Sequence, residues 1–244
     1  MRDNVGKGVV PKIEVERVLD RLRSVSDPDA VAGMAAFGIK AANTLGVSMP
    51  AIRRLARDIG RDHALAKALW ETGVHEARIL AGLVDELELV TDEQMERWVN
   101  DFDSWDVCDQ ICMNLFDRTP VAYEKALEWS RRDAEFVKRA GYAMMATLAV
   151  HDKKADDKKF LRFLPAIRAG ADDERNFVKK AVNWALRQIG KRSLELNSEA
   201  VKLARELRQE RSASARWIAS DALRELEGAA VLERLARRAR PKYT

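Results

Sequence analysis

Apolar residues recur at spacings of three and four along almost the whole chain, and this pattern constrains the fold more than any other feature. Such spacing places apolar side chains on one face of an α-helix, whereas a half-buried strand alternates apolar and polar residues. The sequence contains no convincing alternating run of strand length. It therefore predicts an all-α protein, with helices over residues 12–25, 27–37, 48–59, 61–72, 75–86, 91–101, 104–117, 120–131, 134–150, 157–169, 173–190, 197–209, 213–227 and 229–239.

Short internal repeats indicate how these helices are arranged. The run FVKRA at residues 136–140 reappears as FVKKA 41 residues later, and the run ALR at 185–187 reappears 37 residues later. Periods of this length are typical of HEAT and armadillo repeats, in which helix pairs stack into a superhelix. We expect one helical-repeat domain over residues 1–244, an α-α solenoid with a concave basic groove, whose ends at 1–10 and 240–244 are flexible.

Cysteine usage and hydropathy exclude several classes of protein. The two cysteines, Cys108 and Cys112, are too few and too close for a disulfide framework, and we interpret both as core residues. No apolar run is long enough to cross a membrane, and the N-terminal residues lack a signal-peptide pattern. These features favour a cytoplasmic protein.

The distribution of charge is more informative than its total. Lys and Arg number 43 against 39 acids, a net charge of +4. Residues 85–103 carry eight acids and one base, whereas residues 234–242 carry five bases and no acid. A polyanion such as DNA is repelled by the first stretch and attracted by the second.

The segment at residues 102–112 contains the strongest candidate for chemistry. At about 100° per residue, Trp105 and Asp109 lie one turn apart at the edge of the apolar stripe. Asp106 falls in the first turn, where the helix dipole favours a carboxylate. Asp109 is too far into the helix to cap it, so it is either a catalytic acid beside an indole or an acid that is solvated or paired with arginine. The predicted buried stripe consists of Cys108, Ile111 and Leu115.

A second helix combines an aromatic side chain with a basic rim. Trp184 shares a helical face with Lys180, Arg187 and Lys191, an arrangement suited to a polyanion backbone. The alternative is a tryptophan that packs between repeats, with its neighbouring bases in solvent. We assign the other tryptophans to packing: Trp70, Trp98, Trp129 and Trp217.

Together with GVSMPAIRRLA at residues 46–56, these two segments resemble the AlkD-like DNA alkylation-repair family, which consists of HEAT-like-repeat DNA glycosylases. The resemblance covers about residues 37–238. It implies that Trp105 and Trp184 are aromatic walls and that Asp109 is the catalytic carboxylate. It also implies backbone contacts from Arg139 and Arg187. The remaining DNA-binding candidates are Lys138, Lys179, Lys180, Lys191 and Arg53.

Two departures from the family pattern concern the aromatic residues. Ser104 stands where many members have a second tryptophan, and no aromatic residue near the N-terminus is clearly assigned to the lesion. These departures affect the range of substrates more than the reaction. The assignment also requires Trp105 and Trp184, 79 residues apart, to converge on one basic hollow.

The chemistry implied by the resemblance suits this residue set. Alkylation at N3 or N7 gives a purine a positive charge, so the leaving base needs no protonation. A single poorly solvated anion is then sufficient to stabilise the oxocarbenium-like sugar and to orient water. We expect neither a cofactor nor a metal, because the three histidines, His63, His75 and His151, lack ligand spacing.

We therefore expect a monofunctional DNA N-glycosylase that excises N3- and N7-alkylated purines from double-stranded DNA. It is expected to be a monomer, to be associated with the nucleoid and to have no membrane partner. The main alternative is a catalytically inactive helical-repeat protein that binds DNA structure or a protein partner. A scaffold that binds no nucleic acid is the third possibility.

Overall fold

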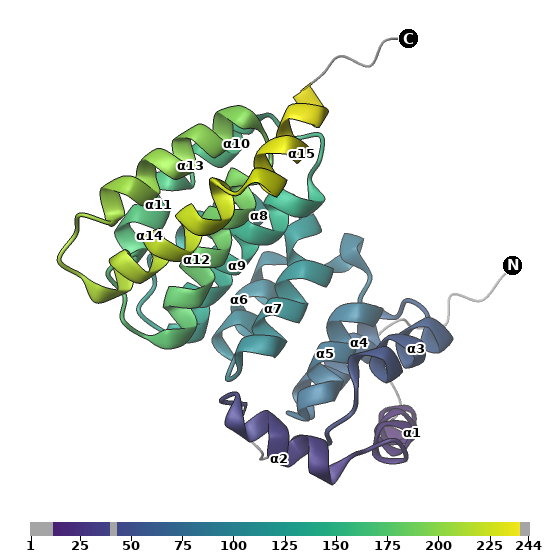
Figure 1. Ribbon diagram of the computed structural model, residues 1–244. Coiled ribbons are helices and arrows are strands. Elements are labelled where there is room, and N and C mark those ends of the chain that lie inside the picture. The colour runs from purple at the N-terminus through teal and green to yellow at the C-terminus, as the bar shows by residue number, and fades with distance from the viewer. Residues whose placement is uncertain (1–11, 40–42, 240–244) are drawn as a thin grey trace, which may run out of the picture. The chain divides into compact units, whose positions relative to one another are not determined.

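The computed structural model describes residues 12–39 and 43–239, and within these ranges the chain forms fifteen α-helices, two 3₁₀ turns and no strand (Figure 1). The prediction of an all-α protein is confirmed. The ends predicted to be flexible, residues 1–10 and 240–244, lie outside the described residues. None of the helices within these ranges is long and apolar enough to span a membrane.

The chain divides into two compact units, residues 1–119 and 120–244. The single domain expected for the whole chain stays a prediction. Unit 1 contains α1 (Lys12–Arg23), α2 (Pro28–Ala36), α3 (Met49–Ile59), α4 (His63–Glu71), α5 (His75–Val84), η1 (Leu87–Leu89), α6 (Asp92–Asn100), α7 (Trp105–Asn114) and η2 (Phe116–Arg118). Unit 2 contains α8 (Ala122–Trp129), α9 (Glu135–His151), α10 (Asp157–Leu161), α11 (Leu164–Gly170), α12 (Asn176–Gly190), α13 (Leu194–Leu207), α14 (Ala213–Leu226) and α15 (Ala229–Ala239).

Most helices begin and end near their predicted bounds, and the largest difference has an identifiable cause. The helix predicted over 157–169 is two helices, because α10 ends at Leu161 and α11 begins at Leu164. Pro165 occupies the first turn of α11. Proline lacks the backbone N–H that a continuous helix needs there, whereas this group is not required in the first turn of a new helix.

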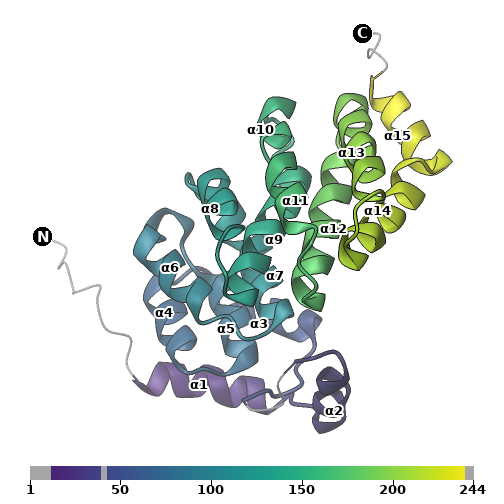
Figure 2. The same ribbon diagram turned by 90° about the vertical axis from the view of Figure 1, so that its left-hand side faces the viewer.

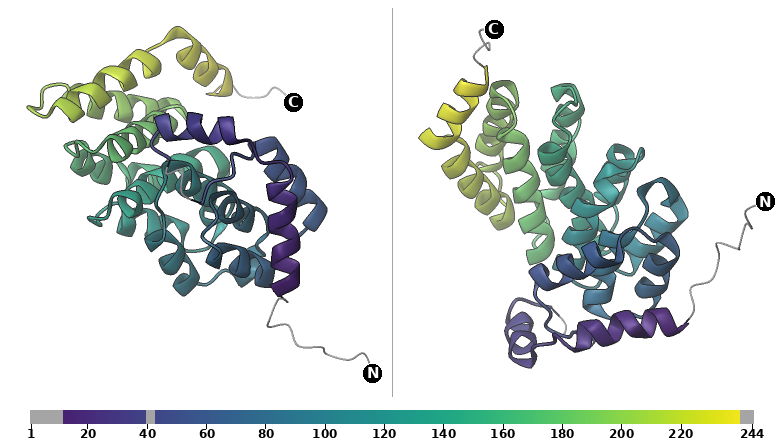
Figure 3. Two further views of the ribbon diagram at one scale, coloured as in Figure 1. Left: turned by 90° about the horizontal axis from the view of Figure 1, so that it is seen from below. Right: turned by 90° about the vertical axis from the view of Figure 1, so that its right-hand side faces the viewer.

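In unit 1, α5 is the central helix. It packs against α3, α4 and α7, and α1 lies against α4 and α5 (Figure 3). Beside it, Trp70 of α4 stacks on Trp98 of α6 with ring centroids 4.1 Å apart. Both rings are almost fully buried, as is Trp129 in unit 2. The assignment of these three tryptophans to packing is confirmed.

In unit 2, the long helices α9, α12 and α14 pack in succession. Each is accompanied by a further helix: α8 packs on α9, α13 on α12 and α14, and α15 on α13 and α14 (Figure 2). Residues 140–149 of α9 are all buried, as expected for a helical stretch that is apolar nearly all round and lies between neighbouring helices.

The internal repeats occupy corresponding places on adjacent helices. Phe136 of α9 and Phe177 of α12 lie side by side, with ring centroids 5.6 Å apart. The two ALR runs fall on α12 and α14, which also pack together. The sequence period is therefore a structural period in unit 2.

A glycine allows α8 and α9 to approach each other closely. A Cβ atom on Gly141 would lie 2.3 Å from the backbone nitrogen of Ser130 and 2.8 Å from the carbonyl oxygen of Ala126. Both atoms belong to backbone, which cannot rotate away as a side chain can. The packing of α8 on α9 therefore requires glycine at this position.

We predict that Gly141→Ala lowers the free energy of unfolding by about 1–3 kcal/mol, because it overpacks a close backbone contact. Gly33→Ala in α2 is the matched control. Nothing lies within 4 Å of its added methyl group, and alanine gains about 0.5–1 kcal/mol over glycine in a helix. Chemical denaturation of both variants measures the difference, and equal stabilities would contradict the prediction.

Candidate functional site

Helix α7 positions the candidate carboxylate and its neighbouring indole. Ser104 is the N-cap, Trp105 is the first helical residue and Asp109 follows one turn later. Both Trp105 and Asp109 are half-buried, in agreement with their predicted place at the edge of the apolar stripe. The residues predicted for that stripe are almost completely buried: Cys108, Ile111 and Leu115.

The indole of Trp105 is oriented by a distant part of unit 1. Its Nε1–H donates to the carbonyl oxygen of Phe37 at 3.1 Å, across 68 residues of sequence. Phe37 is the C-cap of α2, and 70% of it is exposed. An exposed aromatic residue thus lies next to Trp105, although no local sequence pattern indicates this pairing.

A largely buried ion pair fixes the start of α7. His75 Nε2 lies 2.8 Å from Asp106 Oδ2. Burial lowers the pKa of His75, but the hydrogen bond and the charge of Asp106 outweigh it, and the net pKa is raised. Burial raises the pKa of Asp106, but His75 outweighs it and the net pKa is lowered. The predicted first-turn position of Asp106 is confirmed, whereas its partner has no sequence signal.

The residue after His75 holds the segment that leads into α3. The carboxylate of Glu76 is 1% exposed and accepts hydrogen bonds from the backbone N–H groups of Leu45, Gly46 and Val47, at 2.7–3.2 Å. Gly46 has φ +75°, and a Cβ there would lie 2.1 Å from the carbonyl oxygen of Asp27. This turn therefore requires glycine and is clamped by a single buried acid.

The predicted base on α3 lies in a basic hollow of unit 1. Arg53 is exposed and lines a hollow of about 390 Å³ with Arg57, Arg61 and Asn114. Asn114 is the last residue of α7. One end of α7 thus borders three arginines, which is favourable for a nearby polyanion.

The two cysteines on α7 are core residues, as predicted. Both are free and fully buried. Burial raises the pKa of the Cys112 thiol well above its usual range, and Cys108, Asp109 and Asp117 raise it further. A neutral thiol is a poor nucleophile. Across the described ranges, no three His, Cys, Asp or Glu side chains form a group that could hold a metal ion.

In unit 2, the basic rim of α12 is paired with acids on the next helix. Trp184 is half-buried and Lys180 is exposed. Arg187 Nη1 lies 3.1 Å from carboxylate oxygens of both Asp221 and Glu225. The Lys191 Nζ lies 2.6 Å from Glu225. Part of the predicted positive rim is therefore neutralised within unit 2.

The other predicted bases of unit 2 also have partners. Lys138 Nζ lies 3.3 Å from Asp173. Arg139 is 6% exposed, and its Nη1 donates to the carbonyl oxygen of Phe177 at 2.6 Å. This bond ties α9 to the start of α12. The roles of Lys138 and Arg139 in binding DNA stay predictions.

The assignment of Trp217 to packing is wrong. The residue lies on α14 and is 41% exposed, and Lys179 Nζ lies 5.2 Å from its ring centroid. The buried stripe of α14 includes Ala215, Ile218, Ala219 and Ala222, and at about 100° per residue Trp217 lies roughly opposite this stripe. Lys179 therefore lies beside an exposed aromatic ring rather than a buried one.

Comparison with known proteins identifies the family of the chain. The sequence model of the family described as "DNA alkylation repair enzyme" matches residues 18–226. The chain belongs to this family, as its resemblance implied. No curated protein matches it.

A solved structure shows the same fold. It is described as "a new family of proteins related to the HEAT-like repeat DNA glycosylases with affinity for branched DNA structures". The similarity has a TM-score of 0.73 at 18% identity, and it covers 87% of this chain and 95% of that chain. The predicted HEAT-like helical-repeat fold is confirmed, while the concave basic groove stays a prediction.

We predict that His75→Ala lowers the free energy of unfolding by about 3 kcal/mol, because it leaves the buried carboxylate of Asp106 without its cation. His151→Ala is the control, since His151 is exposed on the last turn of α9. Urea denaturation followed by tryptophan fluorescence measures both variants. Equal effects would show that the ion pair does not anchor α7.

The same pair predicts how stability depends on pH. The folded pKa of His75 is raised above 6.5, so its contribution is complete below pH 6.5 and is lost as pH rises through the folded pKa. The folded pKa of Asp106 is lowered below 3.8, so its contribution is complete above pH 3.8 and is lost as pH falls through the folded pKa. In the variant His75→Gln, the loss of stability as pH rises through the folded pKa of His75 should disappear. Denaturation at a series of pH values measures this difference.

Proposed function

We propose that this protein is a monofunctional DNA glycosylase that hydrolyses the N-glycosidic bond of positively charged N3- and N7-alkylated purines in double-stranded DNA. One observation carries the proposal: a half-exposed carboxylate, Asp109, and an indole, Trp105, lie one turn apart on a helix anchored by a buried ion pair. Membership of the DNA alkylation repair family supports it.

The reaction requires little of the protein besides a positioned anion. As the bond from the sugar to the base breaks, its electron pair moves to the cationic purine, which leaves as a neutral base. The sugar becomes an oxocarbenium-like cation, which Asp109 stabilises electrostatically. Water then attacks the sugar and gives its proton to the carboxylate.

The aromatic side chains act on the positive charge of the lesion or the sugar. A ring face beside a cation contributes about 0.5–2 kcal/mol. Trp105 is the first such ring, and its hydrogen bond to Phe37 sets its orientation. We assign Phe37 as an additional aromatic contact because the residue is exposed and its backbone carbonyl binds the indole of Trp105. Trp184 is the proposed aromatic contact on α12.

The remaining residues bind the DNA backbone. Lys180 and Arg53 are exposed and are the most accessible of the proposed contacts. Arg187 and Lys191 contact phosphate by exchanging their carboxylate partners for it. The macromolecule that the protein binds is duplex DNA with alkylated purines, and the protein acts on it as a monomer at the nucleoid. The other proposed backbone contacts are Lys138, Arg139 and Lys179.

We predict that Asp109→Asn reduces the release of methylated purines on the order of 10²–10³-fold, because the amide keeps the shape of the carboxylate but carries no charge. Asp103→Asn is the matched control, since its side chain is 49% exposed shortly before α7. Chromatography of bases freed from methylated duplex measures both. DNA binding should persist in both variants, and equal release by Asp109→Asn and the wild type would end the assignment.

We predict that Asp221→Asn raises the affinity for duplex DNA roughly twofold to fivefold, because it removes a carboxylate that competes with phosphate for Arg187. The amide oxygen can still accept the hydrogen bond from Asn183. Glu227→Gln is the control, since Glu227 pairs with Arg205 rather than with a proposed DNA contact. Fluorescence anisotropy at fixed salt measures affinity, and unchanged binding would show that Arg187 does not reach phosphate.

A non-catalytic DNA-binding protein is the second candidate function. The similar solved structure belongs to proteins described as having affinity for branched DNA structures. This candidate requires tighter binding to a four-way junction than to a duplex, with no release of alkylated bases. Base release that depends on Asp109 would exclude it as the complete function.

A further inference from the structure

A basic hollow in unit 2 lies at the ends of α9 and α12 and beside α15. Its volume is about 710 Å³. Five cationic side chains and one carboxylate line it, together with Gln188 and three small or apolar residues. The charged residues are Lys153, Lys191, Arg192, Arg234, Arg238 and Asp157.

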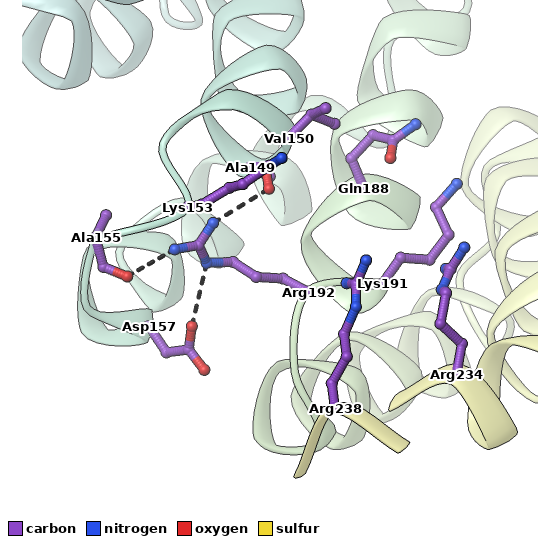
Figure 4. A pocket seen from close by; sticks show the side chains of 10 residues that line it. All are labelled: Ala149, Val150, Lys153, Ala155, Asp157, Gln188, Lys191, Arg192, Arg234 and Arg238. Carbon is purple, nitrogen blue, oxygen red and sulfur yellow. Dashed lines mark hydrogen bonds and ion pairs between the residues drawn. The ribbon is translucent and has the colours of Figure 1, made fainter. Parts of the chain in front are cut away.

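One of these cations builds the wall of the hollow. Arg192 donates to Asp157 at 3.2 Å and to the carbonyl oxygens of Ala149 and Ala155 at 3.2 and 2.6 Å (Figure 4). Its guanidinium also lies 4.2 Å from the ring centroid of Phe160. Arg192 thus uses its donors to join α9, α10 and α12, and it shapes the site rather than binding a ligand.

Three other cations have no acid to neutralise them. Among the described residues, no carboxylate lies within ion-pair distance of Lys153, Arg234 or Arg238. The Nε atom of Arg234 is buried and donates to no acceptor within the described ranges. In Figure 4, Arg234 and Arg238 extend from α15 toward Lys191. Like charges gathered in one hollow repel each other, and an anion relieves that repulsion.

The lining indicates which anion the hollow accepts. None of the ten described residues that line it is aromatic, so it offers no ring on which a nucleobase could stack. Arginine and lysine side chains are the usual ligands of phosphate oxygens. The hollow therefore recognises phosphate groups rather than bases.

We propose that this hollow is a binding site for the phosphodiester backbone of DNA, in which Arg234 and Arg238 of α15 contact phosphates. The choice of DNA rests on the function proposed above. Lys191 belongs both to the basic rim of α12 and to this hollow. The site therefore extends the contacts of α12 to the last helix of unit 2.

The test is the salt dependence of binding to an undamaged duplex. Replacing both arginines (Arg234→Gln with Arg238→Gln) should reduce the slope of log affinity against log salt by about two. The corresponding loss of affinity at 0.1 M salt is roughly tenfold to sixtyfold. Arg237→Gln is the matched control, because the residue is exposed on the same helix but does not line the hollow.

One further variant and one small anion make the result decisive. Replacing both arginines by lysine keeps the charge and should preserve the slope, so an equal loss in the lysine and glutamine variants would overturn the proposal. A slope in the glutamine variant equal to that of Arg237→Gln would also overturn it. Tripolyphosphate should compete with duplex for the wild type. If the glutamine variant lost tripolyphosphate binding but kept the wild-type salt slope for duplex DNA, the hollow would be a site for free phosphates instead.

This outcome is separate from that of the glycosylase proposal. Asp109→Asn should keep the wild-type salt slope while losing base release. A wild-type protein that releases no base would refute the glycosylase function, and the slope of the arginine variants would still test the phosphate site.

Discussion

The polar groups at the two ends of α5 hold unit 1 together. His75 and Glu76 begin the helix and are almost fully buried, and Asp85 follows its end with no exposed surface. A buried charge is stable only when it is paired or hydrogen-bonded. His75 therefore holds α7, Glu76 holds the segment before α3, and Asp85 accepts from His63 and Gln94 of α4 and α6. The position of the candidate carboxylate on α7 depends on this one helix.

Unit 2 depends on a different kind of constraint. Its long helices pack through small and apolar residues, and Gly141 lets α8 reach the backbone of α9. Charges remain at the rims, where Arg187 and Lys191 meet acids of α14. Those acids fix the long cationic side chains in place before any ligand arrives. Under the proposed function, a phosphate has to compete with these acids for Arg187 and Lys191, so its affinity would depend on salt and on the acids as well as on the bases.

Much of the fold could be predicted from the sequence, because helical periodicity is a local property. The apolar stripe on α7 and the edge positions of Trp105 and Asp109 follow from the spacing of residues within one helix. The acids that pair with α12 left no such local signal, because Asp221 and Glu225 belong to the next long helix, 34 or more residues away from Arg187 and Lys191. The assignment of Trp217 to packing is wrong because it considers the residue type alone, whereas the spacing within α14 places Trp217 opposite the buried stripe.

By itself the sequence determined the helical class, the bounds of most helices, the repeat of unit 2 and the family. Each of these is encoded in residues that are neighbours along the chain or recur at a regular interval. Only the tertiary structure decided which polar groups meet. His75 pairs with Asp106, and the indole N–H of Trp105 binds the carbonyl oxygen of Phe37. The same holds for Arg234 and Arg238, which lie beside Lys191 through folding alone. These pairs join segments that are far apart in sequence, and the packing of whole helices, rather than local propensity, brings them together.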